Sequence, residues 1–333
     1  MTLPIPSTIL VTGATGFTGR VLVKKLVAAG HTVRVIARPS STTGDLEGLP
    51  IQWFRGEVYS PEVVAEAMEG VTVVFHIATL YRDGGADETE HQKVHVESTK
   101  LLAIAATKQA SFSRFVHVST VGVHGHIDTP PADETATIAP GDAYQRTKWE
   151  AEKWLHDFAA ANDLPYTVIR PAAIYGAGDA RLLKVFRMAL KKRYVLLGNG
   201  KCLYHLIHVD DLTDVMMRAA WHPGALGEVF ICGNPTAVTL EELGRTVAKT
   251  LNHPFKVLRV PAGPVFLLAD ICEFVCKPFG ISPPLYRRRV AFFTKDRCFD
   301  THKVRNTLEW EPRLTNEEGI RETALAYRDQ GKL

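Results

Sequence analysis

Short apolar segments alternate with longer polar and apolar stretches over the first half of the chain. The apolar segments are predicted to be strands and cover residues 9–11, 32–36, 71–77, 115–119 and 166–170. The stretches between them are predicted to be helices and cover residues 20–29, 61–68, 91–108 and 143–162. Because strands and helices alternate, the pattern predicts repeated β-α units and a parallel sheet.

The predicted strands are apolar throughout, which indicates that helices cover both faces of the sheet. We therefore expect an α/β fold with a doubly wound parallel sheet. After about residue 175 the regularity weakens, and glycines and prolines interrupt shorter segments. This change predicts a first domain over residues 1–175, with a returning segment around 203–233. Residues 176–202 and 234–333 are then expected to form a smaller C-terminal lobe.

Composition and charge exclude several classes of protein. Of the 333 residues, 46% are hydrophobic and 23% are charged, which is typical of a globular protein. A net charge of +3, with no long basic stripe, argues against a nucleic-acid partner. Five cysteines, an odd number, favour a reducing compartment, so we expect a cytoplasmic protein.

Two features bear on membranes. The chain enters its first predicted strand without an export signal. Its longest apolar stretch, residues 265–279, contains Asp270, Glu273 and Lys277 and is too short to span a bilayer. We expect no transmembrane segment.

A glycine-rich turn, Thr12 to Gly19, lies between the first predicted strand and the first helix. Gly13 would permit a tight turn, Gly16 a close approach to phosphate, and Gly19 close packing of helix on strand. Three glycines can match this spacing by chance, but a strand before and a helix after make a pyrophosphate site at the helix N-terminus the better interpretation. The pattern predicts a dinucleotide-binding fold of Rossmann type.

The end of the second predicted strand bears on which dinucleotide is bound. An acidic residue there would accept a hydrogen bond from a free ribose 2′-hydroxyl. The sequence has no acidic residue at this position and has Arg38 instead. An arginine can pair with a 2′-phosphate, so NADP is favoured over NAD. The alternative is that Arg38 is only a solvated side chain.

Tyr144 and Lys148 are four residues apart on one predicted helix and therefore share a face. A free tyrosine, with a pKa of about 10, is a poor proton acceptor at neutral pH, and a nearby cation favours its phenolate. Thr120, after a strand end, would bond the reacting oxygen, with Ser119 as its substitute. These residues predict a proton-transfer set for hydride chemistry at an alcohol carbon. The alternative is an ordinary exposed face carrying Tyr and Lys.

The chain resembles the extended short-chain dehydrogenases/reductases over nearly its whole length. Besides the glycine turn and the Thr, Tyr, Lys set, residues 170–176 are similar to the family's Arg-Pro segment and residues 208–211 to its His-Val-Asp-Asp element. The resemblance implies a homodimer formed through the helices near 91–108 and 143–162. Two positions depart from the family, since Glu57 replaces an aspartate and His95 a structural asparagine. The cofactor contacts that it implies are Gly13, Thr15, Gly16, Phe17, Gly19, Arg38, Glu57, Val58, Ile77, Ala78, Ser119, Tyr144, Lys148, Pro171 and Ile174.

The second half of the chain must decide the substrate. Residues 283–290, 297–300 and 308–312 resemble the 3β-hydroxysteroid, sterol-4-carboxylate and hopanoid-associated branch, which implies a lipophilic alcohol or ketone as substrate. A nucleotide-sugar epimerase or dehydratase is the alternative, with a second pyrophosphate bound by Arg181, Lys184, Arg187 or Arg193. A third possibility is an NADP-binding sensor without turnover, against which the complete catalytic set argues.

Residues 265–276 form a predicted helix with more apolar surface than one contact requires. It can complete the core of the C-terminal lobe, line the pocket, or touch a membrane surface beside Arg287, Arg288 and Arg289.

Overall fold

A seven-stranded parallel sheet organises the computed structural model, which describes residues 6–80, 88–279, 283–286, 290, 294 and 296–333. Its strand order is β11-β6-β5-β4-β1-β2-β3, and each neighbouring pair is parallel. The strands are β1 (Thr8–Thr12), β2 (Thr32–Ala37), β3 (Ile51–Arg55), β4 (Val73–His76), β5 (Arg114–Val118), β6 (Tyr166–Pro171) and β11 (Val229–Cys232). The order reverses between β1 and β4, which opens a ligand crevice at their carboxyl ends.

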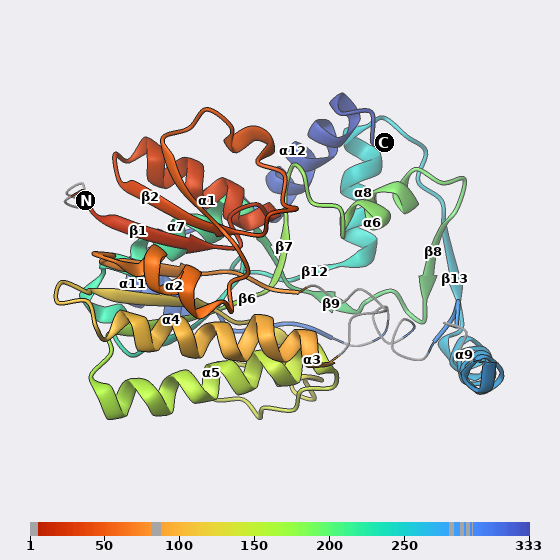
Figure 1. Cartoon of the computed structure of the whole chain (residues 1–333). Helices are drawn as coiled ribbons and strands as arrows, with labels where there is room; N and C mark the ends of the chain where they lie inside the picture. Colours follow the sequence, from red (N-terminus) through yellow and green to blue (C-terminus); the bar gives the residue numbers. More distant parts are fainter. Residues whose placement is uncertain (1–5, 81–87, 280–282, 287–289, 291–293, 295) are drawn as a thin grey trace.

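Helices cover both faces of this sheet (Figure 1). Ile9 and Val11 point into a core shared with α1 (Phe17–Ala28), α7 (Val209–Trp221) and α11 (His302–Leu308). Leu10 points the other way, into a core shared with α2 (Pro61–Met68), α4 (Ser98–Ala106) and α5 (Ala143–Asn162). The doubly wound α/β fold predicted from the apolar strands is therefore confirmed.

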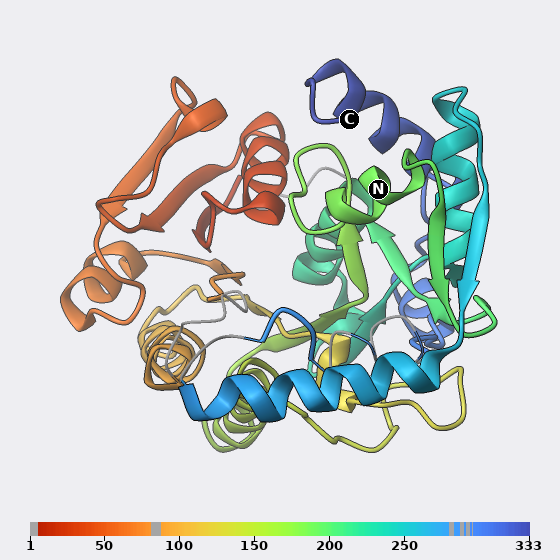
Figure 2. The ribbon, with the colours of Figure 1, turned by 90° about the vertical axis from the view of Figure 1, so that its right-hand side faces the viewer.

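A third core holds the C-terminal lobe together (Figure 2). It is built from α6 (Leu183–Ala189), α8 (Leu240–Thr250) and α12 (Asn316–Asp329), and the last two each begin with a capping box. Three two-stranded ladders lie outside the seven-stranded sheet: β7 (Ala173–Tyr175) with β10 (Leu206–His208), β9 (Leu203–Tyr204) with β12 (Val238–Thr239), and β8 (Tyr194–Leu197) with β13 (Val257–Val260). The domain boundaries given above stay a prediction.

Some elements differ from those predicted. Helix α1 begins at Phe17, three residues before the expected start, because the helix opens directly after the glycine turn. Strand β3 is half-exposed at the sheet edge, so its sequence lacks the apolar run that marked the others. The expected helix over 91–108 is divided into α3 (Glu88–His91), a π-helix η2 (Gln92–Glu97) and α4. Side chains of Ser98 and Thr99 bond carbonyls four residues back, which competes with regular α geometry.

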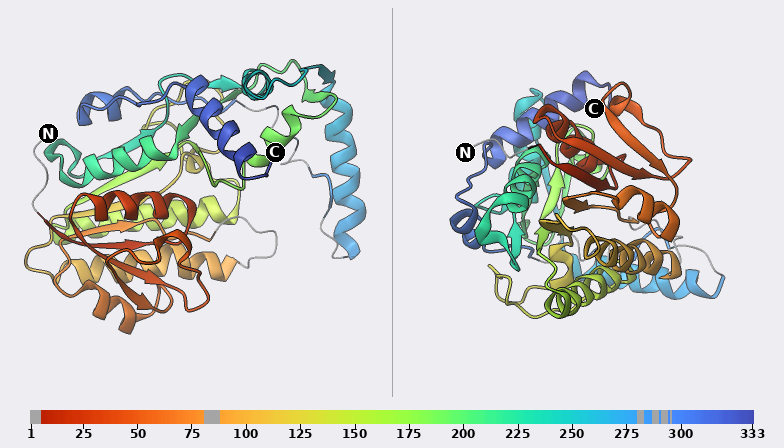
Figure 3. Two further views of the ribbon diagram at one scale, coloured as in Figure 1. Left: turned by 90° about the horizontal axis from the view of Figure 1, so that it is seen from above. Right: turned by 60° about the vertical axis from the view of Figure 1, so that its left-hand side comes forward.

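Helix α9 (Ala262–Cys276) does not complete the core of the lobe, which corrects one interpretation of its sequence. Ala269 is its one fully buried described side chain, because the helix follows β13 outward to the edge of the molecule (Figure 3). Among the described residues, no helix is long and apolar enough to cross a bilayer. Arg287, Arg288 and Arg289 lie outside the described residues.

Candidate active site

A cavity of about 1780 Å³ lies at the carboxyl ends of the central strands, between the sheet and the C-terminal lobe. This exceeds the roughly 300–1,000 Å³ of a pocket for one drug-sized ligand, so a dinucleotide and a second molecule fit together. All of the site residues predicted from the sequence line it: Gly13, Thr15, Gly16, Phe17, Gly19, Arg38, Glu57, Val58, Ile77, Ala78, Ser119, Thr120, Tyr144, Lys148, Pro171 and Ile174. Their individual roles stay predictions.

The glycine turn has the geometry of a phosphate cradle. Gly13 has a φ of +72°, and a Cβ there would lie 2.8 Å from the backbone nitrogen of Ala78. A Cβ on Gly19 would overlap the Gly13 carbonyl and lie 2.6 Å from the Cα of Ala14. Gly16 precedes α1 without a side-chain cap, so the first amides of the helix can serve an anion. These residues fit the pyrophosphate of a dinucleotide.

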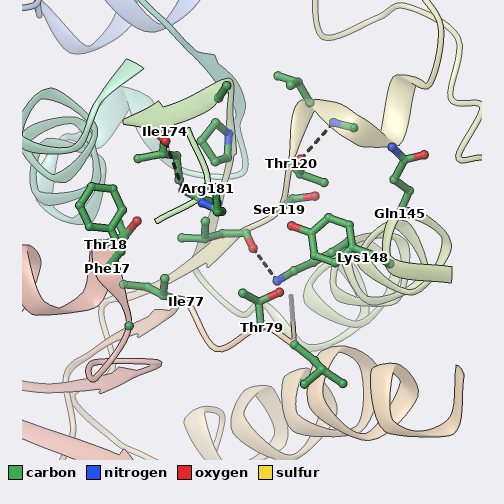
Figure 4. A pocket seen from close by; sticks show the side chains of 18 of the residues that line it. Phe17, Thr18, Ile77, Thr79, Ser119, Thr120, Gln145, Lys148, Ile174 and Arg181 are labelled. Carbon is green, nitrogen blue, oxygen red and sulfur yellow. Dashed lines mark hydrogen bonds between the residues drawn. The ribbon is translucent and has the colours of Figure 1, made fainter. Parts of the chain in front are cut away.

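Helix α5 carries the predicted proton-transfer pair into the cavity. Asp142 caps the helix by accepting the Gln145 amide at 2.8 Å, which fixes Tyr144 in the first turn. Lys148 follows one turn later, is 2% exposed, and donates from Nζ to the Val118 carbonyl at 2.9 Å (Figure 4). Burial lowers the pKa of Lys148 to about 7, although Glu152 acts against this shift. Such a group can gain and lose a proton at neutral pH.

Thr120 and Ser119 both lie beside this pair, after the end of β5 (Figure 4). The Thr120 hydroxyl oxygen accepts the Gly122 amide at 3.0 Å and caps a short helix, η3 (Val121–His124). That bond occupies an oxygen lone pair and leaves the hydroxyl hydrogen available to a ligand oxygen. Ser119 is buried, and its backbone amide donates to the Ile169 carbonyl at 2.7 Å. Both hydroxyls line the cavity, and the assignment of Thr120 to the substrate oxygen, with Ser119 as its substitute, stays a prediction.

His95 joins the loop after β4 to the start of α5. Its Nε2 accepts the Leu80 amide at 3.2 Å, and its Nδ1 lies 2.8 Å from the Thr147 hydroxyl. Since that hydroxyl donates to the Ala143 carbonyl at 2.9 Å, it must accept from Nδ1–H, which defines a neutral tautomer. Burial, followed by the charge of Lys148, holds the pKa of His95 far below its usual range. A neutral histidine thus replaces the asparagine expected at this position.

A buried ion pair between Glu152 and Arg170 joins α5 to β6, and it was not predicted from the sequence. The Glu152 carboxylate accepts from Nε and Nη2 of Arg170, with an Nε distance of 3.0 Å. Arg170 also donates to His124 Nε2 at 3.0 Å, and His124 Nδ1 donates to the Ala136 carbonyl. Glu152 lies one turn after Lys148 on the same helix face, and that spacing is the signal that could have identified it.

Arg38 lies at the exposed rim of the cavity, directly after β2. On the next strand, Arg55 stacks over Trp53 at 4.8 Å and donates to the Ser41 carbonyl at 3.3 Å. Glu57, the departure noted in the sequence, lines the same rim. In the part of the chain that the structure describes, no group of three or more His, Cys, Asp or Glu side chains could hold a metal ion.

Comparison with known proteins assigns this site to a family. The model of the NAD dependent epimerase/dehydratase family matches residues 9–233, which include the glycine turn, Tyr144 and Lys148. The chain belongs to this family. The predicted extended short-chain dehydrogenase/reductase membership and the prediction of an NAD(P)-linked oxidoreductase are confirmed at this level.

Individual relatives differ in activity. The 3-beta-hydroxysteroid dehydrogenase of Mycolicibacterium neoaurum is 30% identical, over 96% of this chain and 91% of its own. The UDP-glucose 4-epimerase of Vibrio cholerae is 28% identical, over 97% of this chain and 96% of its own. The crystal structure of gox2253 superposes with a TM-score of 0.83 at 26% identity, covering 98% of this chain and 99% of that chain. The family therefore includes both candidate substrate classes.

Replacing Gly19 with Ala should weaken dinucleotide binding, because the added methyl group would overlap the Gly13 carbonyl and deform the cradle. Gly263→Ala is the matched control, since a Cβ at Gly263 meets no atom within 4 Å. Coenzyme affinity, measured by fluorescence titration, should fall by roughly 10-fold or more for Gly19→Ala only. Equal affinity in the two variants would contradict the proposed packing role of Gly19.

Replacing Lys148 with Met should change the pH dependence of stability. The folded pKa of about 7 lies below the 10.5 of an exposed lysine, so between these values only the unfolded chain holds the proton. The contribution of Lys148 to stability therefore rises with pH across this window and is least favourable at pH 7 and below. In coenzyme-free urea unfolding at pH 7, 8 and 9, the stability of wild type relative to Lys148→Met should rise by up to about 1.4 kcal/mol per pH unit. Parallel curves for the two proteins would show that Lys148 is not buried as an amine.

Proposed function

We propose that the protein is a dehydrogenase/reductase that transfers a hydride between NADP and a secondary alcohol or ketone of a lipophilic molecule of the 3β-hydroxysteroid or sterol-carboxylate class. The steroid dehydrogenase relative supports this class, and the UDP-glucose 4-epimerase relative supports the alternative. The character of the substrate side of the cavity favours the first.

The observation that carries the proposal concerns the four cations suggested for a second pyrophosphate. Arg181 and Lys184 line the cavity, whereas Arg187 and Arg193 are not among its described lining residues. The guanidinium of Arg181 already bonds the Asp179 carboxylate at 2.8 Å and the Ile174 carbonyl at 3.2 Å (Figure 4). The Asp179 carboxylate offsets the charge of Arg181 and two of its five N–H donors are in use, which weakens the case for a second pyrophosphate at this position.

The remaining wall of the substrate side is rich in apolar and aromatic groups. It is lined by Leu182, Val185, Met188, Tyr204, Phe266, Tyr286 and Phe299. Binding a hydrocarbon skeleton to such a surface is favourable, because apolar groups on both sides are removed from water. Charged residues lie at the same wall, among them Glu273 and Arg297, so a polar group on one end of the substrate can also be accommodated.

The catalytic residues act on the proton that accompanies the hydride. When bound, the nicotinamide accepts or supplies that hydride. In oxidation, the Thr120 hydroxyl would orient the substrate oxygen and the Tyr144 phenolate would take its proton. Lys148 in its protonated form would favour that phenolate, and in reduction Tyr144 would return the proton.

The proposed function is tested by following coenzyme reduction at 340 nm with a panel of 3β-hydroxysteroids and a panel of UDP-sugars. Steroid-dependent reduction is expected, and Tyr144→Phe should lower turnover about 100-fold or more while leaving coenzyme affinity nearly unchanged. Turnover of UDP-sugars without net reduction would instead identify an epimerase or dehydratase. Coenzyme binding without any turnover would favour the sensor, and full activity in Tyr144→Phe would contradict the mechanism.

The preference for NADP rests on Arg38 and on the lack of an acid at the end of β2. Arg38→Asp replaces a cation with an anion, which repels a 2′-phosphate and accepts a bond from a free 2′-hydroxyl. The dissociation constant for NADP should rise by roughly 10-fold or more, while that for NAD changes little or falls. Equal losses for both coenzymes would mean that Arg38 does not read the phosphate. The homodimer and the cytoplasmic location expected from the sequence stay predictions.

A further inference from the structure

Helix α9 presents an unusually apolar face to the outside of the protein. Phe274 is 81% exposed and Leu267 is 61% exposed, values that few large apolar side chains reach in a soluble domain. Their neighbours on the helix repeat at the spacing of one face, so that all of them fall within roughly 140° around the axis. We call this set the α9 apolar face; it consists of Pro264, Leu267, Leu268, Ile271, Phe274 and Val275.

The other side of the same helix belongs to the substrate cavity. Phe266 and Glu273 lie seven residues apart, hence on one side of the helix, and both line the cavity. Ala269, between them, is fully buried. Since one side of α9 lines the cavity and the opposite side is exposed, the α9 apolar face lies directly outside the cavity wall, and whatever covers it lies beside the substrate site.

We propose that the α9 apolar face docks on the surface of a lipid bilayer, with the helix lying in the plane of the interface. The helix has 15 residues and is about 22 Å long, shorter than the roughly 30 Å hydrocarbon core, so it lies along the bilayer and does not cross it. No hydrogen-bonding side chain interrupts the face, and Asp270 stands at its border. The interior of a bilayer forms no hydrogen bonds with a docked helix, whereas an interface with another protein usually includes several.

The charge of the following sequence complements an anionic lipid surface. Between Phe274 and Lys295 the chain has five basic residues and no Asp or Glu. Basic residues close to an inserted apolar helix attract anionic headgroups. Of the five, Arg287, Arg288, Arg289 and Lys295 lie outside the described residues, and their sequence places them within 20 residues of Val275.

Docking in this orientation would give a lipophilic substrate a short path. A molecule dissolved in the bilayer could pass along α9 to the cavity wall at Phe266 without entering water. This matters because moving a large apolar molecule into water costs free energy. This consequence rests on the proposed function. The docking itself does not, because the exposed face and the basic sequence that follows it are independent of the substrate.

The experiment is co-flotation of the full chain, without substrate, with vesicles of phosphatidylcholine alone or mixed with phosphatidylglycerol. We expect the wild type to float with the mixed vesicles and less with phosphatidylcholine. The double variant Leu267→Glu/Phe274→Glu should lower the partition coefficient roughly 10-fold or more, because it places two charges in the inserted face. Leu226→Glu is the matched control: Leu226 is 56% exposed, lies on another element, and its replacement should leave flotation unchanged.

Two further measurements separate the possible outcomes. NADP affinity and light scattering, applied to all three proteins, establish that the variants are folded and report their oligomeric state. Wild type that stays with the lipid-free fraction, or a double variant that floats equally well, would overturn the docking proposal. So would a wild-type dimer that becomes monomeric in the double variant while neither protein binds vesicles, since the face would then join two copies. If the protein turns over steroids but does not bind vesicles, the docking proposal is wrong and the proposed function stands. If it binds vesicles but does not turn over steroids, the docking proposal stands and the proposed function is wrong.

Discussion

The buried amine of Lys148 is the constraint around which the active site is built. A lysine that is almost fully removed from water loses most of its hydration, and the fold compensates with one carbonyl, that of Val118, and the negative potential of Glu152. Glu152 can carry its charge there because Arg170 pairs with it inside the same core. The helix, strand β5 and strand β6 are thus fixed to one another by a single chain of polar contacts. The position of Tyr144 follows, since it lies one turn before Lys148 on the same rigid helix.

Two neutral histidines, His76 and His95, form further buried polar contacts beside these residues. His76 lies between the hydroxyls of Thr12 and Ser98, and His95 connects the Leu80 amide to Thr147. Burial lowers the pKa of both histidines, so neither adds a positive charge beside Lys148. A protonated histidine here would repel the lysine and oppose its protonation, whereas a neutral ring only orients its neighbours. The replacement of an asparagine by His95 is compatible with the chemistry for this reason.

The cofactor half of the protein was predictable from sequence because its determinants are local. The glycine turn, Arg38 and the Tyr144–Lys148 spacing each lie within one strand-turn-helix unit, and the structure brings all of them to one cavity. The spacing from Lys148 points to Glu152, but its partner Arg170 comes from another strand, and the contact of His95 with Thr147 also joins two elements, so neither pairing could be read from the sequence. Strand β3 was missed because an edge strand need not be apolar on both faces. The position of the apolar helix α9 could not be predicted for a related reason. The sequence shows how apolar a helix is, but not which other elements pack against it.

The second half of the chain explains why one family supports such different substrates. The wall that faces the nicotinamide side is held by the buried network, and a change there would move Tyr144 or Lys148. The opposite wall comes from α6, β9, α9 and the segment around Phe299, whose ring lies 6.1 Å from that of His124 in the network. Substitutions on this wall can therefore exchange a pyrophosphate-binding surface for an apolar one at little cost to the catalytic geometry. In this chain Arg181 is paired with Asp179 and the apolar helix α9 contributes to the edge of the cavity, and the proposed lipophilic substrate rests on these two features. Both features favour a hydrocarbon skeleton over a second nucleotide, because each removes something that a pyrophosphate would need or adds surface that a pyrophosphate could not use.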